Sequence, residues 1–175
     1  MKYKILHQGR RIQVALHETT LEDGTLIRRD VVLHPGAVAI LPIFDDGSIC
    51  LLRNHRFIFE TTLWEIPAGT REPGESPDLT AHRELAEETG YTCATLEKIA
   101  EFIPSPGVMS EVIHVYVARG LKAGPMRPEA DEQLEPVRVA WSDALEWVVN
   151  GTIRDAKTIT AILLEDRRRR LSEDR

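Results

Sequence analysis

The sequence lacks the long apolar runs and the leader pattern that mark membrane or secreted proteins. No stretch approaches the ~20 continuous apolar residues of a membrane-spanning helix, so we expect no membrane partner. The segment Met1–Gln8 has no apolar run followed by a small-residue cleavage site, so we expect no signal peptide.

Cysteine is scarce. The two cysteines, Cys50 and Cys93, lie far apart in the sequence and in apolar surroundings. We expect buried, reduced thiols, with a disulfide as the less favoured alternative. Free thiols fit a reducing compartment, and we therefore expect a cytoplasmic protein.

Positive charge is also in deficit. The 22 Lys and Arg residues are outnumbered by 28 Asp and Glu residues, and the net charge of −6 argues against broad binding to nucleic acid. The run Arg167–Arg170 is the one opposing feature. It ends an apolar-periodic stretch, where cations complement the helix dipole, so we interpret it as a solvated helix end.

The 175 residues suit one domain with a small appended unit. Loose alternation over Gln13–Thr20 and Thr25–Leu33, with a turn signal at Leu21–Gly24, predicts a hairpin. His34-Pro35-Gly36 then interrupts the pattern. We expect residues 1–34 to form a small antiparallel sheet that mediates dimerisation, and residues 35–175 to form the main domain.

Strands and helices alternate after this break. The apolar run Ala37–Phe44 predicts a buried central strand, and a helix is expected from Ser76-Pro77 to Gly90, because these residues favour helix starts and ends. Together these elements predict a mixed α/β (α+β) fold with a mixed sheet. The other expected elements are strands at Ser48–Arg53, Leu96–Ile103, Glu111–Ala118 and Val137–Trp141, and helices at Ser142–Asn150 and Asp155–Arg170.

The expected helix after Ser76 carries clustered carboxylates. Glu84 and Glu88 are one turn apart on one face, with Glu87 beside them. We expect the apolar Leu79, Ala81, Leu85 and Ala86 to pack this helix against the sheet. Such a cluster without nearby His or Cys favours Mg²⁺, with Mn²⁺ as a substitute. Solvent-facing glutamates are the plain alternative.

The segment Gly69–Tyr91 resembles the Nudix box at its fixed positions: Gly69, Glu75, Arg83-Glu84-Leu85, Glu87-Glu88 and Gly90. Tyr91 departs from the pattern, since the family usually has an aliphatic residue there. The resemblance implies a Nudix fold, with a mixed β-sheet sandwiched between helices. It also implies metal-dependent hydrolysis of a nucleoside diphosphate linked to another group.

The same resemblance assigns roles within the box. Glu84 and Glu88 would be the main metal ligands, and Glu87 would contribute directly or through water. Ala68 would offer a backbone carbonyl to the metal, with Gly69 allowing close approach. Arg83 would orient the carboxylates by ion pairing, and we count Arg83 and Glu87 among the catalytic residues.

Features outside the box resemble the ADP-ribose pyrophosphatase branch: His34–Val38, Trp64–Gly69 and Ser105-Pro106-Gly107 with Glu111. Arg56 matches an arginine that contacts substrate phosphates, although Asn54 replaces the usual glutamine two residues earlier. Glu111 would face the terminal ribose. The resemblance further assigns substrate contacts to Glu65, Thr70, Ser105 and Gly107.

The general base is expected in the acidic loop Pro128–Glu135. Glu132 best matches the branch's loop glutamate, which also touches metal. Glu135 is the alternative and Glu129 a distant third. A carboxylate base needs no strongly raised pKa where a metal acidifies the attacking water.

We therefore expect Mg²⁺-dependent hydrolysis of ADP-ribose to AMP and ribose 5-phosphate by a homodimer. Another nucleoside diphosphate sugar, such as GDP-mannose, is the alternative substrate, and a sensor that only binds ADP-ribose is a remote one. The branch stacks adenine on aromatic residues of its N-terminal sheet. No tryptophan precedes Trp64 here, so the adenine-stacking residues and the base preference stay open.

Overall fold

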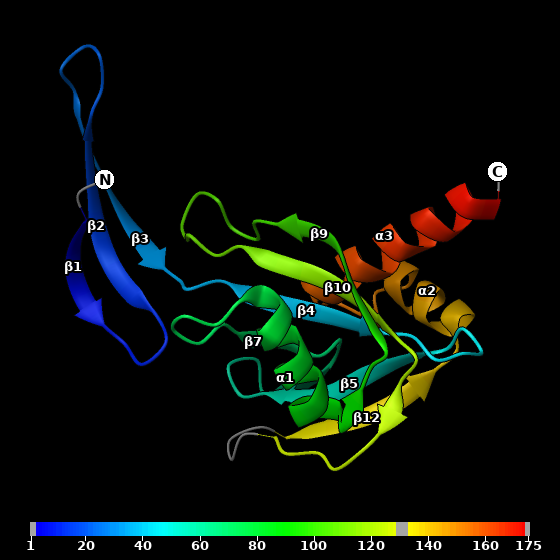
Figure 1. Cartoon of the computed structure of the whole chain (residues 1–175). Coiled ribbons are helices and arrows are strands. Elements are labelled where there is room, and N and C mark those ends of the chain that lie inside the picture. The colour runs from blue at the N-terminus through cyan, green and yellow to red at the C-terminus, as the bar shows by residue number, and fades with distance from the viewer. Residues whose placement is uncertain (1–2, 129–132, 174–175) are drawn as a thin grey trace.

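The structure is a computed structural model that describes residues 3–128 and 133–173. A small antiparallel sheet projects from one end of a larger α+β body (Figure 1). Its strands are β1 (Tyr3–Gln8), β2 (Gln13–Thr20) and β3 (Leu26–Leu33), in that order. The sequence predicts the β2–β3 hairpin correctly. It does not predict strand β1, because the residues of β1 show no clear alternation of polar and apolar side chains.

The main sheet is mixed, as predicted. Its order is β7-β4-β10-β9, and β4 pairs with β10 in parallel while the other pairs are antiparallel. Every residue of β4 is buried, as expected for a central strand covered on both faces. The bounds of these strands are β4 (Ala37–Pro42), β7 (Ala68–Thr70), β9 (Thr95–Phe102) and β10 (Ile113–Arg119).

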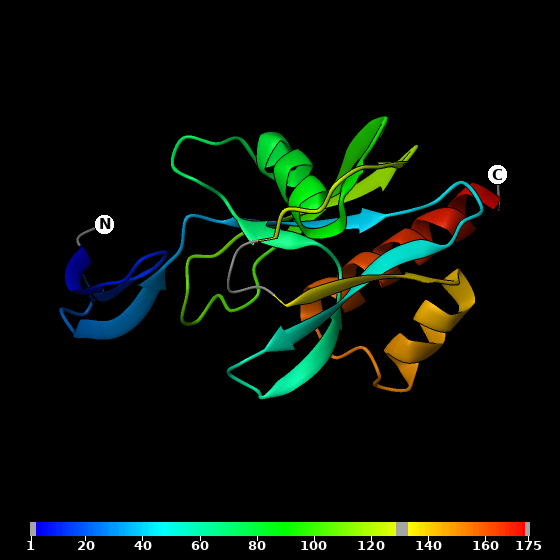
Figure 2. The ribbon, with the colours of Figure 1, turned by 90° about the horizontal axis from the view of Figure 1, so that it is seen from below.

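Helices cover both faces of the main sheet, as the turned view makes plain (Figure 2). Helix α1 (Pro77–Thr89) packs Ala81 and Leu85 against one face of β4. Helix α3 (Ala156–Glu173) and a second sheet cover the other face. The predicted arrangement of a mixed sheet between helices is therefore confirmed.

The second sheet has the order β12-β5-β6 and lies beside helix α2 (Trp141–Val149). Strand β12 begins at Leu134, three residues earlier than predicted, so Glu135 belongs to a strand and not to the acidic loop. Trp141 begins α2 instead of ending a strand. The remaining bounds are β5 (Ile49–Arg56), β6 (Thr61–Glu65), β8 (Tyr91–Thr92), β11 (Lys122–Ala123) and β12 (Leu134–Val139).

Helix α1 begins and ends as its capping residues predict. The Ser76 hydroxyl accepts a hydrogen bond from Leu79 N, and Gly90 ends the helix with a left-handed φ of 72°. Leu79 itself is 62% exposed, so its predicted packing against the sheet is wrong. It lies two residues, or about 200° of helical rotation, from the buried Ala81 and therefore on the opposite face.

Backbone pairing ties the small sheet to the body. Val32 N donates to Val108 O at 2.8 Å, and Ser110 N donates to Val32 O at 2.9 Å. Gly36 then adopts a φ of 95°, which a residue with a side chain would rarely adopt. The small sheet is therefore attached to the body through the segment just before the start of β10.

Both cysteines are free thiols, but only Cys50 is buried, while Cys93 is half-buried. No helix in the described part of the chain is long and apolar enough to cross a membrane.

Candidate active site

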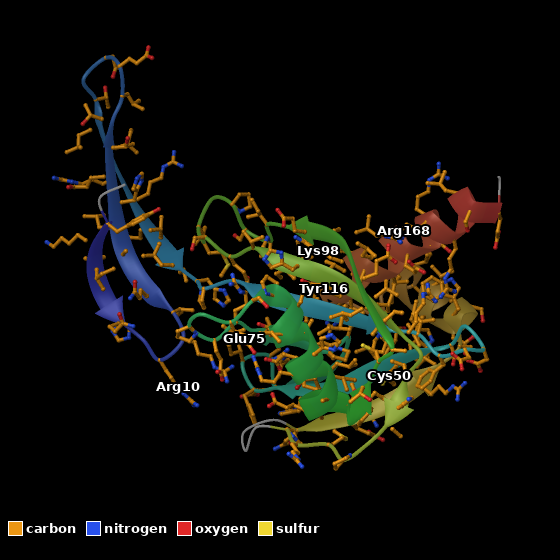
Figure 3. The ribbon with its side chains drawn as sticks, in the orientation of Figure 1. Arg10, Cys50, Glu75, Lys98, Tyr116 and Arg168 are labelled. Atoms are coloured by element: carbon orange, nitrogen blue, oxygen red, sulfur yellow. The ribbon has the colours of Figure 1, made fainter. Side chains whose placement is uncertain are left out.

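A cleft of about 790 Å³ brings together the small sheet, the segment before α1 and the start of α3. Figure 3 shows two of the contributing regions, with Arg10 at the turn between β1 and β2 and Glu75 just before α1. The lining of the cleft includes charged, polar and aromatic side chains: Arg10, Arg11, Arg56, Thr70, Arg71, Arg83, Glu84, Glu88, Phe102, Glu111, Asp155 and Lys157.

Glu84 and Glu88 form a buried acidic pair on the wall of this cleft. Glu84 is only 8% exposed and Glu88 only 4% exposed. The two side chains lie one helical turn apart, so two carboxyl groups are buried close to each other. Ala68 N donates to Glu88 Oε2 at 2.8 Å. A Cβ atom at Gly69 would overlap the carboxylate of Glu84, so only glycine allows the backbone to approach it. The fold thus brings two carboxylates against the Ala68-Gly69 backbone.

Arg83 organises the carboxylates around it. Its guanidinium donates to Glu84 Oε1 at 2.7 Å, to Glu87 Oε2 at 3.0 Å and to both oxygens of Glu75. The hydrogen bonds to Glu75 are the main reason why the pKa of Arg83 is raised. In return, Arg83 lowers the pKa of Glu75 to about 2. Glu75 and Arg83 therefore both stay ionised at neutral pH.

Glu87 differs from its two neighbours. Its side chain is 36% exposed and does not line the cleft. Its carboxylate is bound to Arg83 at the edge of the helix. A direct role of Glu87 in metal binding stays a prediction.

The donor set suits a hard divalent cation. The carboxylates of Glu84 and Glu88 and the Ala68-Gly69 backbone offer oxygen ligands at the side of the cleft. Mg²⁺ typically takes one or two carboxylates and fills its other positions with water and phosphate. Among the described residues, no three His, Cys, Asp or Glu side chains form a ready cage. An all-oxygen pair of this kind suits a hard divalent cation.

A second charged group lies on the α3 side of the cleft. Arg56 forms a two-pronged ion pair with Glu65, with Nε at 2.7 Å from Oε1 and Nη2 at 2.5 Å from Oε2. Lys157 Nζ also reaches Glu65 Oε2, at 2.6 Å. Burial raises the pKa of Glu65, but the hydrogen bonds from Arg56 and the charge of Lys157 outweigh burial and lower it.

Arg56 and Glu65 take different places in this group. Arg56 lines the cleft and is close enough to the acidic pair for the charge of Glu88 to contribute to its raised pKa, after the larger effect of Glu65. Glu65 is 2% exposed and lies behind Arg56, outside the cleft lining. A direct contact between Glu65 and substrate stays a prediction.

The other substrate residues predicted from sequence divide into two sets. Thr70 and Glu111 line the cleft. Ser105 and Gly107 do not; they belong to a turn in which Ser105 O accepts hydrogen bonds from Val108 N and Met109 N. Their predicted substrate contacts therefore have no support from the cleft geometry.

The structure also brings in residues that the sequence analysis missed: Arg10, Arg11, Arg71, Phe102 and Lys157. Lys157 carried one local signal. It stands in the first turn of α3, where the helix dipole disfavours a cation. The other four carry no local signal, because only the tertiary structure places them at the cleft.

Of the three candidates for the general base, Glu129 and Glu132 lie outside the described residues. Glu135 pairs with Arg53 across β12 and β5, with Arg53 Nη1 at 2.9 Å from Glu135 Oε2. Side chains alternate along a strand, so Arg53 and Arg56 point to opposite faces of β5. Glu135 therefore faces away from the cleft side of this sheet.

The chain is similar to several known proteins. The chain is 42% identical to the ADP-ribose pyrophosphatase of Bacillus subtilis (strain 168), over 90% of this chain and 86% of that protein. It is 37% identical to a methanol dehydrogenase activator of Bacillus methanolicus, over 93% and 89%. It is also 32% identical to a GDP-mannose pyrophosphatase of Cronobacter sakazakii (strain ATCC BAA-894), over 82% and 81%.

A solved structure described as an ADP compounds hydrolase shares the fold, with a TM-score of 0.83 and 23% identity over 95% of this chain and 91% of that one. The Nudix domain profile matches residues 33–161, a segment that includes the acidic pair, Arg83 and the cleft-facing Arg56 and Lys157. The chain belongs to the Nudix family.

Proposed function

We propose that the protein hydrolyses the diphosphate bond of ADP-ribose in a Mg²⁺-dependent reaction that yields AMP and ribose 5-phosphate. One observation carries the proposal. The buried Glu84 and Glu88 carboxylates stand one turn apart against the Ala68-Gly69 backbone, inside a cleft large enough for a nucleotide. The choice of ADP-ribose as the substrate is supported by relatives that are named ADP-ribose pyrophosphatases.

The residues of the chain have distinct tasks in this proposal. Glu84, Glu88 and the carbonyl of Ala68 would hold Mg²⁺, and Mn²⁺ could take its place. When bound, the metal neutralises the phosphate charge and acidifies the attacking water. Arg83 keeps the Glu84 carboxylate in place, and Glu87 supports the site through Arg83 or through water.

The substrate is held by groups around the acidic pair. Arg56 offers a planar guanidinium to the phosphate oxygens, a geometry suited to two parallel hydrogen bonds. Thr70 and Glu111, which line the cleft, contact the substrate, and Glu111 accepts from the hydroxyls of the terminal ribose. Glu132, with Glu129 as the weaker candidate, removes the proton from the attacking water.

GDP-mannose is the second candidate substrate. The 32% identity to a GDP-mannose pyrophosphatase favours it. Both candidates share the same diphosphate chemistry. They differ only in the base and the sugar, which the acidic pair does not touch.

A substrate panel with Mg²⁺ tests the proposal. Nucleotide sugars, dinucleotides and nucleoside triphosphates are incubated with the protein, and the products are identified by mass spectrometry. We expect ADP-ribose to give the highest kcat/KM and to yield AMP and ribose 5-phosphate. A higher kcat/KM with GDP-mannose would overturn the assignment of ADP-ribose as the substrate. Reaction in ¹⁸O-labelled water identifies the attacked phosphorus by the product that carries the label.

We further propose a cytoplasmic homodimer in which the small sheet, residues 1–34, forms the contact. Apolar side chains on this sheet support a dimer, since Ile5 and Leu6 are 45% and 52% exposed on β1. The free thiols of Cys50 and Cys93 support a reducing compartment.

A further inference from the structure

Lys157 stands out among the cations of the cleft because of how firmly it is held. Its side chain is only 14% exposed, and its Nζ donates to Glu65 Oε2 at 2.6 Å and to Asp155 Oδ1 at 2.9 Å. An ammonium has three donors. Within the described part of the chain two are engaged, and one stays available on a residue that lines the cleft.

Arg56 shares the same anchor. Its Nη2 and the Nζ of Lys157 both lie within 2.6 Å of Glu65 Oε2, so the two nitrogens are at most about 5 Å apart. Arg56 uses Nε and Nη2 for Glu65, which leaves other N–H groups of its fork for a ligand. Two cations therefore face the cleft as a preorganised pair, fixed by one buried carboxylate.

The supports of Lys157 are themselves rigid. Asp155 Oδ2 accepts from Thr158 N at 3.0 Å and from Thr158 Oγ1 at 2.6 Å. The same Thr158 hydroxyl accepts from Ile66 N at 2.8 Å, in the segment that leads to Ala68. The position of Lys157 is thus fixed relative to the backbone that meets the acidic pair.

We infer that Lys157 is a phosphate-binding residue of this cleft and that, with Arg56, it binds adjacent phosphoryl groups of a diphosphate. The inference rests on the proposed function for the identity of the substrate, but not for the anion that is recognised. A pair of fixed cations favours a diphosphate over a single phosphate, because each cation can meet oxygens of a different phosphoryl group.

The test compares Lys157→Met, Lys157→Arg and the matched control Lys98→Met, which removes a lysine that pairs with Glu101 on β9 outside the cleft (Figure 3). Inorganic pyrophosphate and orthophosphate are titrated calorimetrically into each protein in metal-free buffer. We expect wild-type protein to bind pyrophosphate more tightly than orthophosphate. Lys157→Met should weaken pyrophosphate binding about 10- to 100-fold, as for the loss of a hydrogen bond to a charged group.

Kinetics supply the second readout. With Mg²⁺ and ADP-ribose, Lys157→Met should raise KM by a similar factor and change kcat less, while Lys157→Arg recovers most of the affinity and Lys98→Met behaves like wild type. If Lys157 were only structural, Lys157→Met would lower the melting temperature without raising KM more than it changes kcat. If Lys157→Met does not fold, Lys157→Gln takes its place in both measurements.

The role of Lys157 and the identity of the substrate are tested by different outcomes. Unchanged pyrophosphate binding in Lys157→Met, or no pyrophosphate binding by wild type, would overturn the role of Lys157 even if ADP-ribose is hydrolysed. Conversely, a wild-type protein that does not cleave ADP-ribose would overturn the substrate, while weaker pyrophosphate binding in Lys157→Met would still support the phosphate site.

Discussion

Single residues at the cleft combine high burial with negative charge. Glu84 and Glu88 are buried like-charged neighbours, an arrangement that costs a few tenths of a kcal/mol even on an exposed helix. Sequence analysis could predict this pair, because its spacing and the glycine at position 69 are local features. It could not predict that Glu65 is hidden behind Arg56, since burial depends on contacts between residues distant in the chain.

Glu84→Gln and Glu88→Gln should each reduce kcat/KM for the Mg²⁺-dependent reaction by about 100- to 1,000-fold, comparable to the loss of one group that stabilises charge in a transition state. Both variants should stay folded, because glutamine keeps the shape of the side chain and its amide oxygen can still accept from Arg83 or from Ala68 N. Steady-state kinetics and thermal melts check this, with the α2 variant Glu146→Gln as control. Rates near wild type in both variants would contradict the assigned site.

Glu75 should make the stability of the protein depend on pH. Because Arg83 lowers the folded-state pKa of Glu75 to about 2, below the usual 4.5, the ion pair stabilises the fold above pH 4.5 and loses this effect as the pH falls toward 2. Urea unfolding of Glu75→Gln should therefore show reduced stability at pH 7. The difference from wild type should shrink between pH 5 and pH 3, and a constant difference would argue against the ion pair.

At the scale of elements, local signals determined what could be predicted. Helix α1 was predictable because Ser76, Pro77 and Gly90 act within a few residues of its ends. Strands β6 and β7 were not, because each is short and is defined by its partners, such as the pairing of Ala68 with Ala39. Lys157 and Glu65 are 92 residues apart, and no pattern along the chain relates them.

Helix α3 shows the same limit. Three arginines of the run Arg167–Arg170 are exposed, as predicted for a solvated helix end, but α3 continues to Glu173 and Arg169 is half-buried. Glu165 is 3% exposed and meets Arg119 at 2.5 Å, with Arg168 and Arg169 nearby. Arg169 also lies 3.7 Å above the Trp141 ring, and Arg168, labelled in Figure 3, pairs with Glu97.

Glu165→Gln should therefore destabilise the protein by about 1–3 kcal/mol, because it removes the charge that several arginines share at a buried position. The adjacent Asp166→Asn is the control. It breaks only the pair with Arg170, whose side chain is 66% exposed, and should cost less than about 1 kcal/mol. Urea unfolding measures both. Equal losses would show that burial of Glu165 is unimportant, and kcat should be unaffected because Glu165 does not line the cleft.

At the scale of the whole molecule, the small sheet is attached to the body but leaves much of its own surface open. Ala15 is fully buried within this sheet, whereas every residue of β1 is exposed. A three-stranded sheet with so little cover is better stabilised by packing against another surface. The division into residues 1–34 and 35–175 stays a prediction, although the separate hydrogen-bonding of β1–β3 is consistent with it.

Light scattering during size-exclusion chromatography should give the mass of a dimer. Leu6→Glu places a charge on the exposed β1 surface and should shift the protein toward the monomer, while the control Lys98→Glu on β9 should not. A monomeric wild-type protein at micromolar concentration would contradict the dimer.

In the proposed complex, the acidic pair and the Arg56–Lys157 pair hold the two sides of one diphosphate. Crystals containing Mn²⁺ and a non-hydrolysable methylene analogue of ADP-ribose test it directly, because anomalous scattering locates the metal. We predict metal bound to Glu84, Glu88 and the Ala68 carbonyl, with the diphosphate between the metal and Arg56. Metal bound elsewhere, or a diphosphate turned away from Glu84 and Glu88, would contradict the proposed site.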